Sequence, residues 1–509
     1  MNEPAAPEFR AIADLVRAHA KAEPERLALR EGGQALSYAQ LDALMDRVAA
    51  ALQRDGTRPG DTIAICAAAS IEYAAVFLGA LRAGVAAAPL APGSTLGQLA
   101  AMLADAGAKH LFLDASTARS FPEDIGAQRI ALDGSDAGRA LDAWLAPVGT
   151  QPHSVEVDPQ SAFNIIYSSG TTGTPKGIVQ SHAMRWAHVQ RADRFGYSPR
   201  TVTLLATPLY SNTTLVVFFP TLAAGGCVVL MRKFDCEAYL ELAQRWRVTH
   251  TMLVPVQYQR LLAHPGFDAH DLSSFEYKFC TSAPFRAELK AEVLGRWPGG
   301  LVEFYGLTEG GGTCILAAHL HPDKLHTVGQ PAEGHDIRLI DEAGRELPRG
   351  ATGEVVGRSG AMMSGYRHQP GLTAQAEWHD ANGLRYIRSG DIGRFDEDGF
   401  RVLLDRRKDM IISGGFNVYP SDLEAVLRRH DAVADAAVVG VASERWGETP
   451  VAFVVLAANA DARSDALLAW ANARLGKTQR LAAVRIVDAL PRSAIGKVLK
   501  RELRARWEG

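Results

Sequence analysis

The chain has little cysteine and no long hydrophobic run. Its five cysteines are scattered over 509 residues and are never in C-x-x-C spacing, so we expect buried, reduced thiols in a cytoplasmic protein rather than a disulfide framework. The longest apolar stretch runs from Leu215 to Ala224, is interrupted by Pro220 and is far shorter than the roughly 20 residues of a membrane span. The first residues carry no basic segment followed by an apolar core, so we expect no signal peptide.

The net charge is also small, and the sequence gives little sign of a cluster of metal ligands. The formal net charge is -3, which argues against a general nucleic-acid-binding protein. His319, His321 and His326 are close in sequence but have no cysteine or H-E-x-x-H partner, so they give little support for a zinc site. A hydrophobic content of 47% and a charged content of 22% are typical of a globular protein, and the length predicts two to four domains.

Strand and helix patterns alternate through the first 330 residues. Ser37 begins a capping-box pattern, and the apolar residues from Leu41 to Leu52 fall on one face of a helix. Such alternation predicts an α/β fold of doubly wound, largely parallel sheets with helices on both faces. Residues 115–160 are weakly patterned, and we expect a connector there. We expect strands near 62–66, 85–90, 110–113, 163–167, 202–206, 227–231, 249–254, 277–281 and 301–304 and helices near 41–52, 71–84, 95–107, 213–224, 236–246 and 256–263.

The pattern changes after about residue 327. Short strands separated by Asp- and Gly-containing turns predict a small antiparallel, barrel-like subdomain over about 327–405. The last hundred residues predict a separate α+β module. We therefore divide the chain into a large N-terminal domain, residues 1–405, and a small C-terminal domain, residues 406–509.

Hydroxyl and glycine residues follow the strand 163–167 without interruption. They are Ser168, Ser169, Gly170, Thr171, Thr172, Gly173 and Thr174, and Pro175, Lys176 and Gly177 close the segment. Glycines let a ligand approach the backbone, hydroxyl and N–H groups donate to anionic oxygens, and the lysine adds charge. The segment therefore predicts a phosphate-binding loop, although it is not of the G-x-x-x-x-G-K-[ST] type.

Two further segments lie where strands end, which is where ligands bind in open α/β sheets. One is Ser282-Ala283-Pro284 and the other is Tyr305-Gly306-Leu307-Thr308-Glu309. The second combines an aromatic face suited to a nucleotide base with a carboxylate suited to a hard cation. Three more distinctive segments follow later in the chain. They are Ser389-Gly390-Asp391, Asp405-Arg406-Arg407-Lys408-Asp409 with Ser413-Gly414-Gly415, and Pro491-Arg492-Ser493-Ala494-Ile495-Gly496-Lys497.

These segments, in this order, resemble the motifs of the adenylate-forming superfamily, which includes acyl-CoA synthetases, luciferase and the adenylation domains of peptide synthetases. The resemblance extends over residues 167–497 and is strongest to the acyl-CoA ligase branch. It implies that the loop binds the ATP phosphates, that Tyr305 stacks on adenine, and that Thr308 meets the α-phosphate. It also implies ATP, Mg²⁺ and coenzyme A as the cofactor and co-substrates.

The resemblance further assigns roles to single residues. It implies that Glu309 holds Mg²⁺, that Asp391 binds the ribose, and that Arg406 contacts the ribose and the phosphate. It also implies that Ser282, Ala283, Pro284 and Gly306 line the nucleotide site. Lys408 would be the hinge about which the C-terminal module rotates, and Gly414 and Gly415 would face the coenzyme A arm. Lys497 would be catalytic, because a lysine that donates to the carboxylate and the α-phosphate together stabilises charge as they join.

The resemblance also places an acyl pocket around residues 210–217, 279–283, 304–306 and 310–313. The candidates are Tyr210, Ser211, Asn212, Phe279, Phe304, Gly306 and Gly311. Many relatives have glycine where this chain has Phe304, and many have histidine where it has Ser211. A phenyl ring in place of hydrogen fills pocket volume, so we expect a small carboxylic acid, branched or hydroxylated, rather than a long fatty acid.

Two other functions remain open. A stand-alone adenylation enzyme would load a carrier-protein phosphopantetheine instead of free coenzyme A, although we expect no carrier module after Gly509. A non-catalytic nucleotide-binding regulator would not need Glu309 and Lys497. We expect no nucleic-acid partner and no membrane span, and both a monomer and a homodimer fit the sequence.

Overall fold

The computed structural model describes residues 8–122, 125–168, 176–406, 409–413, 416–476, 479–493 and 496–508. The chain divides into two compact units. The first unit holds residues 1–325, 332–336 and 358–387, and the second holds residues 326–331, 337–357 and 388–509.

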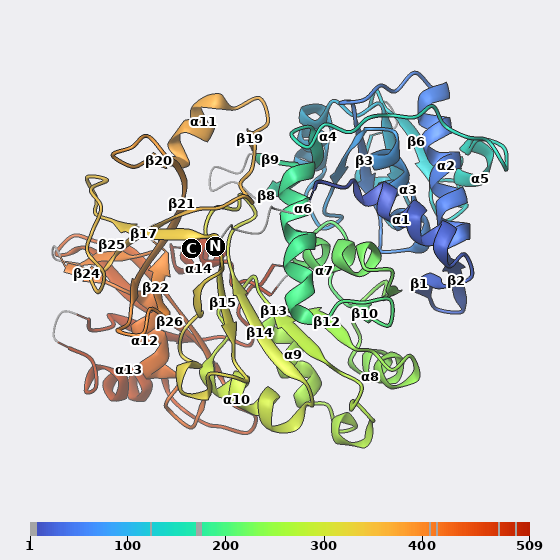
Figure 1. The fold of residues 1–509 in the computed structure, drawn as a ribbon. Helices are drawn as coiled ribbons and strands as arrows, with labels where there is room; N and C mark the ends of the chain where they lie inside the picture. The colour runs from blue at the N-terminus through green and yellow to red at the C-terminus, as the bar shows by residue number, and fades with distance from the viewer. Residues whose placement is uncertain are drawn as a thin grey trace, which may run out of the picture. The chain divides into compact units, whose positions relative to one another are not determined.

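Two sheets form the first unit (Figure 1). One has the strand order β19-β9-β8-β4-β3-β5-β6-β7. Its strands are β19 (Gly365–Tyr366), β9 (Lys176–Ser181), β8 (Ala162–Ser168), β4 (Ala86–Pro89), β3 (Thr62–Cys66), β5 (His110–Leu113), β6 (Gln128–Ala131) and β7 (Arg139–Ala140). Strands β3 to β8 pair in parallel, whereas β9 is antiparallel to β8 and β19 is antiparallel to β9.

The second sheet of this unit has the order β15-β14-β13-β12-β10-β11-β1-β2. Its strands are β15 (Cys314–Ala317), β14 (Gly300–Tyr305), β13 (Tyr277–Cys280), β12 (His250–Leu253), β10 (Val202–Leu205), β11 (Cys227–Leu230), β1 (Leu27–Glu31) and β2 (Gln34–Ser37). Six of these strands are parallel, and β2 and β15 add antiparallel edges. The predicted α/β class is confirmed.

Helices cover both faces of these sheets. They are α1 (Ile12–Ala22), α2 (Tyr38–Arg54), α3 (Ile71–Arg82), α4 (Leu96–Ala106), α5 (Leu141–Trp144), α6 (His182–Gln190), α7 (Asn212–Ala223), α8 (Cys236–Arg245), α9 (Pro255–Leu262), α10 (Ala287–Arg296) and α11 (Pro370–Gln375), with short 3₁₀ helices η1 (Ala118–Ser120), η2 (Arg191–Phe195), η3 (Phe267–Ala269) and η4 (Pro322–Lys324). One continuous core packs α1, α2, α3 and α7 against both sheets, and a second core packs α4 against the other face of the β3–β5 region. The predicted capping box is present, since Ser37 Oγ accepts from Gln40 N at 3.3 Å.

The expected connector over residues 115–160 is wrong. This segment contains β6, β7 and α5, and β6 continues the sheet beside β5 in parallel. The strands are only four and two residues long, so their hydrophobic period is too short to stand out from the surrounding glycines. The sequence pattern also did not predict α1, β1, β2, β9, α6 and α10, where polar residues obscure the apolar period.

The second unit contains β16 (Gln330–Pro331), most of β17 (Asp336–Ile340), β18 (Gly353–Arg358) and β22 (Arg401–Arg406). Strand β21 (Arg385–Phe395) begins in the first unit, where it pairs with β20 (Glu377–His379), and continues into the second, where β22 pairs with it antiparallel. The boundary at residue 405 and the barrel-like subdomain of 327–405 stay predictions.

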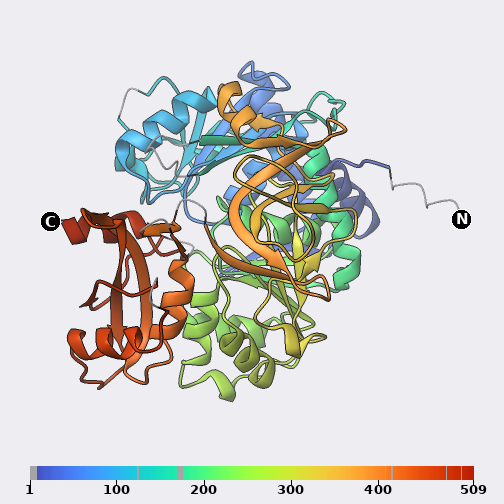
Figure 2. The ribbon, with the colours of Figure 1, turned by 90° about the vertical axis from the view of Figure 1, so that its left-hand side faces the viewer.

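The C-terminal part of the second unit is a sheet with helices on both faces (Figure 2). Its elements are β23 (Ile411–Ser413), β24 (Phe416–Val418), α12 (Pro420–Leu427), β25 (Val433–Ser443), β26 (Gly447–Leu456), α13 (Ser464–Asn472), β27 (Ala483–Ile486) and α14 (Lys500–Glu508). Because strand side chains alternate, Ala436 and Val438 pack towards α12 and α13, whereas Val439 and Val441 pack in the cluster that holds Leu503 of α14. The predicted α+β pattern is confirmed, and β23, β24 and α14 were missed.

Candidate active site

The β8–β9 hairpin carries the predicted phosphate loop. Its last cross-strand pair is Ser168 with Lys176, so the hairpin fixes both ends of the loop. Ser169, Gly170, Thr171, Thr172 and Gly173 lie outside the described residues, and their phosphate contacts stay predictions. The Lys176 ammonium lies 5.5 Å from the centroid of the Tyr366 ring, a distance at which a cation is attracted to an aromatic face.

Tyr366 also joins the loop lysine to the acidic residue of the second motif. Its hydroxyl donates to Glu309 Oε1 at 2.8 Å, and burial, together with the Glu309 charge, raises the pKa of Tyr366. The main chain of Glu309 is held as well, because its carbonyl accepts from Met363 N at 2.8 Å. Lys176 and Glu309 are 133 residues apart in sequence and share one aromatic neighbour, which no motif predicts.

The Glu309 carboxylate fits a site for Mg²⁺. Tyr366 donates to Oε1, and no hydrogen-bond donor among the described residues pairs with Oε2. No group of three or more His, Cys, Asp and Glu side chains in the described ranges is placed to hold a metal. One carboxylate beside a phosphate-binding loop is the donor set of a Mg²⁺ ion whose other ligands are substrate phosphates and water.

A buried network of polar side chains holds the backbone of the second motif, Tyr305–Glu309. Gln180 on β9 donates through Nε2 to the Thr308 carbonyl at 2.6 Å, and its Oε1 accepts from Asn164 Nδ2 at 3.0 Å. Arg185 on α6 donates through Nε to Asn164 Oδ1 at 3.0 Å and through Nη2 to Gln180 Oε1. All three side chains are buried. The motif search missed them; the only available signals were the polar Asn164 and Gln180 within otherwise apolar strands.

Ser282 adopts an unusual backbone conformation at the end of β13. Its φ of 81° lies in the left-handed region, where a residue with a side chain is strained. Its Oγ lies 2.5 Å from Thr213 Oγ1, in the first turn of α7. Such strain is concentrated at functional sites. Ala283 and Pro284 follow directly, so the predicted Ser282–Pro284 segment reaches the start of α7.

The acyl-pocket candidates separate into two groups. Tyr210, Ser211 and Asn212 lie at the start of α7, where Ser211 is the N-cap and accepts from Thr213 N at 3.3 Å. Phe279 and Phe304 pack with ring centroids 5.5 Å apart. Ser211 Oγ therefore already has a structural partner.

Phe195, which the sequence search missed, completes an aromatic cluster with Phe279 and Phe304. Its ring centroid lies 5.3 Å from that of Phe279 and 5.6 Å from that of Phe304. Gly306 is next to the cluster, and a Cβ there would lie 3.3 Å from Thr313 Oγ1. Gly311 has a φ of 91°, which glycine tolerates. The Phe304 ring thus has packing partners at the end of β14.

The remaining motif residues belong to the second unit. Asp391 lies on β21 opposite Arg406 of β22, is 6% exposed, and its N–H donates to Ser389 Oγ at 3.0 Å. The Arg406 side chain, Lys408, Gly414 and Gly415 lie outside the described residues, so their roles stay predictions.

Lys497 is held in a tight reverse turn. Ser493 N donates to the Lys497 carbonyl at 2.8 Å, and Lys497 N donates to Ser493 Oγ at 3.2 Å. Gly496 supplies the positive φ of 76°, and Arg492 and Val498 form an antiparallel bridge. The Lys497 side chain is half-buried. The turn fixes the backbone at this residue, and its catalytic role stays a prediction.

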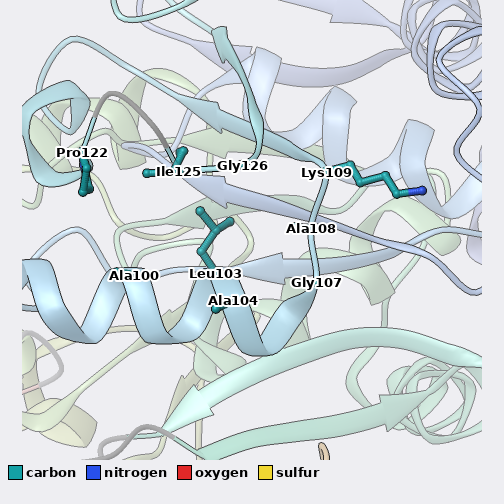
Figure 3. Close-up of a pocket in the computed structure, with 9 residues that line it drawn as sticks. All are labelled: Ala100, Leu103, Ala104, Gly107, Ala108, Lys109, Pro122, Ile125 and Gly126. Carbon is teal, nitrogen blue, oxygen red and sulfur yellow. The ribbon is translucent and has the colours of Figure 1, made fainter.

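A hollow of about 380 Å³ lies elsewhere in the first unit, against α4 (Figure 3). Small and apolar residues line most of it, and the Lys109 ammonium points away from Leu103 and Ile125. None of the motif residues lines it. We therefore assign it no part in the chemistry.

The comparisons with known proteins agree with the motifs. Residues 16–367 match the family model described as AMP-binding enzyme, and residues 422–497 match the AMP-binding enzyme C-terminal domain. The chain belongs to the AMP-binding enzyme family. The resemblance to the adenylate-forming superfamily is thereby confirmed, and the chain is an AMP-forming acid–thiol ligase.

Three family members illustrate the likeness. The chain is 34% identical to a feruloyl-CoA synthase from Amycolatopsis sp over 96% of its own length and 97% of the relative. It is 32% identical to the fatty acid–[acyl-carrier-protein] ligase ScoC of Streptomyces coeruleorubidus over 99% and 98% of the two chains. The crystal structure of ATP-bound MatB from Rhodopseudomonas palustris superposes with a TM-score of 0.87 at 30% identity, covering 97% of this chain and 99% of that one.

Two expectations from composition can also be compared with the structure. All five cysteines are free, and four of them are buried. None of the helices in the described ranges combines the length and apolar character needed to cross a bilayer.

Proposed function

We propose that this family member is an ATP-dependent acid–CoA ligase for a small carboxylic acid. In the first half-reaction a carboxylate oxygen attacks the α-phosphorus of ATP; the new O–P bond forms as the bond to pyrophosphate breaks. In the second, the coenzyme A sulfur attacks the acyl-adenylate carbonyl, the C–S bond forms, AMP leaves and the thiol proton passes to solvent. Mg²⁺, when bound, neutralises charge on the phosphates.

The arrangement of Lys176, Tyr366 and Glu309 supports this proposal most directly. The hairpin that carries the phosphate loop and the segment that follows β14 meet at Tyr366 through a 2.8 Å hydrogen bond and a cation–ring contact of 5.5 Å. A phosphate-binding cation and a metal-binding carboxylate are the two groups that nucleotidyl chemistry needs near each other. The hydrogen bond from Gln180 to the Thr308 carbonyl holds the backbone directly before Glu309 in place.

A panel of carboxylic acids tests the activity. With ATP and Mg²⁺ we expect acid-dependent pyrophosphate release, and with coenzyme A we expect continuous AMP formation and a thioester detectable by mass spectrometry. Pyrophosphate release that coenzyme A does not accelerate would favour the alternative acceptor, a carrier-protein phosphopantetheine, for which the ScoC relative is the precedent. The absence of pyrophosphate with every acid would contradict the proposal.

The aromatic cluster predicts the size of the acid. Phe304→Ala removes the ring that packs on Phe279 and Phe195, so the pocket should accept longer acids. Each methylene accommodated in an apolar pocket is worth about 1–3 kcal/mol. We therefore expect the kcat/KM ratio of eight-carbon to four-carbon acids to rise by at least about 10- to 200-fold, the effect of a single accommodated methylene, measured by AMP release.

Phe304→Leu is the matched comparison, because it keeps much of the side-chain volume and should give an intermediate ratio. Thermal unfolding of both variants checks that the fold persists. If a C12–C16 acid is the best substrate of the unmodified protein, the expectation of a small acid is wrong.

A further inference from the structure

A row of cationic and imidazole side chains runs along α6 and η2 into the first unit. Arg185, His188 and Arg191 are spaced three residues apart, so they share one side of this helical segment. Arg185 is 1% exposed. Arg185 Nη1, His188 Nδ1 and Arg191 Nη1 are all shielded from solvent, and each lacks a hydrogen-bond partner among the described residues. Polar atoms buried in this way are costly unless something binds them.

No carboxylate of the described ranges pairs with Arg185 or Arg191. The titratable groups that act electrostatically on His188 are Arg191, Arg185 and His335, and Arg191 also acts on His335. Burial lowers the pKa of His188 well below its ordinary value, and the nearby arginines lower it further. Burial and Arg191 likewise lower the pKa of His335 to about 4.

Two other buried cations of this unit have carboxylate partners. Lys290 pairs with Glu303 at 2.5 Å, and Arg82 pairs with Asp46 at 2.9 Å. An unpaired buried charge is strongly destabilising. Because no carboxylate of the described residues pairs with Arg191, the structure leaves a place for an external anion beside it.

The cationic row ends at the predicted acyl pocket. Phe195, the last residue of η2, packs on Phe279 and Phe304. His335 Nδ1 accepts from Thr313 N at 3.0 Å, and Thr313 Oγ1 would touch a Cβ at Gly306. Arg191, His188 and His335 therefore lie beside the residues that limit the length of the acid.

We propose that the acid substrate is a dicarboxylic acid and that Arg191, with His188 and His335, binds the carboxylate that does not react. Arg185, which Asn164 and Gln180 hold in place, is a positioning residue that adds positive charge behind His188. This inference rests on the proposed function and names its substrate class. A guanidinium binds a carboxylate through charge-assisted bonds, and a monocarboxylic acid of equal length would leave the buried donors unpaired.

Matched pairs of acids test the inference: succinate with butyrate, glutarate with pentanoate, and terephthalate with 4-methylbenzoate. We expect kcat/KM for AMP formation to be at least about 100-fold higher for the dicarboxylic member of the preferred pair, because sites built to bond a polar group reject analogues that lack it. Arg191→Gln should reduce this ratio to less than about tenfold, since the charge-assisted contact is lost. Arg191→Lys keeps the positive charge but lacks the planar guanidinium that bonds a carboxylate through two N–H groups, so it should give an intermediate ratio.

Arg194→Gln is the matched control. Arg194 lies on the same 3₁₀ segment, but its side chain is 53% exposed and pairs with Glu333. This variant should keep the ratio of the unmodified protein. Thermal unfolding of all three variants separates loss of recognition from loss of fold.

Direct binding provides a readout that does not depend on turnover. Calorimetry without ATP should detect the dicarboxylate and not its partner acid, and imidazole NMR should show the pKa of His188 and His335 rising when the anion binds. Binding lost in Arg191→Gln, without turnover of any acid, would support the anion site and overturn the proposed ligase function. Equal use of both acids of every pair, or an equal effect of Arg191→Gln on both, would overturn the inference and leave the ligase function standing.

Discussion

Lys497→Ala is expected to lower the rate of acyl-adenylate formation by about 10²- to 10³-fold, the cost of removing one preorganised donor to developing charge. The second half-reaction, started from synthetic acyl-adenylate and coenzyme A, should change far less. The reason is that the lysine would stabilise charge only while the carboxylate joins the α-phosphate. Single-turnover measurements of pyrophosphate release and thioester formation distinguish the two half-reactions.

The structure supplies both a reason and a control for this experiment. The backbone of Lys497 is fixed by its two hydrogen bonds with Ser493 and by the positive φ of Gly496, so truncating the side chain should leave the turn intact. Arg501→Ala removes an exposed cation four residues further along the chain and should affect neither step. Equal losses in both half-reactions for Lys497→Ala would contradict the assigned role.

Glu309→Gln is expected to weaken Mg²⁺ binding in the nucleotide complex and to lower kcat/KM for adenylation by about 10²-fold or more, since metal stabilisation of phosphate charge is worth several kcal/mol. The amide keeps the size of the side chain and can still accept from the Tyr366 hydroxyl. The variant therefore tests the negative charge of the Glu309 carboxylate. The dependence of pyrophosphate release on Mg²⁺ concentration should shift to higher concentrations.

Tyr366→Phe is the matched variant, because it keeps the Glu309 carboxylate and removes the 2.8 Å hydrogen bond. One hydrogen bond to a charged group contributes about 1.5–3 kcal/mol, so we expect a smaller loss and an unchanged Mg²⁺ dependence. If Tyr366→Phe were as damaging as Glu309→Gln, the carboxylate would act through its bond to Tyr366 rather than through a metal ion.

The structure and the comparisons also indicate which parts of the chain carried enough local information for prediction. Strand β3 occupies Thr62–Cys66, as the apolar run predicted, because a run of five buried residues between polar turns has the length of a buried strand and is too short for a typical helix. The segments around Gly170, Tyr305 and Asp391 identified the family, since phosphate-binding and strand-end chemistry is encoded in contiguous residues. Strands β6 and β7 were missed because a short edge strand is stabilised by its neighbour, not by its own pattern.

The sequence by itself therefore determined the α/β class and the family, and its motifs predict the ligands. Only the tertiary structure brought Lys176 and Glu309 to Tyr366, linked Gln180 to Thr308, and placed Arg191 beside His335. Glu309 and Tyr366 are 57 residues apart and the other pairs more than a hundred, and their positions depend on how the sheets and helices pack. Whether a buried arginine has an acidic partner is decided by that packing, because no local pattern of residues shows which distant side chains will surround it.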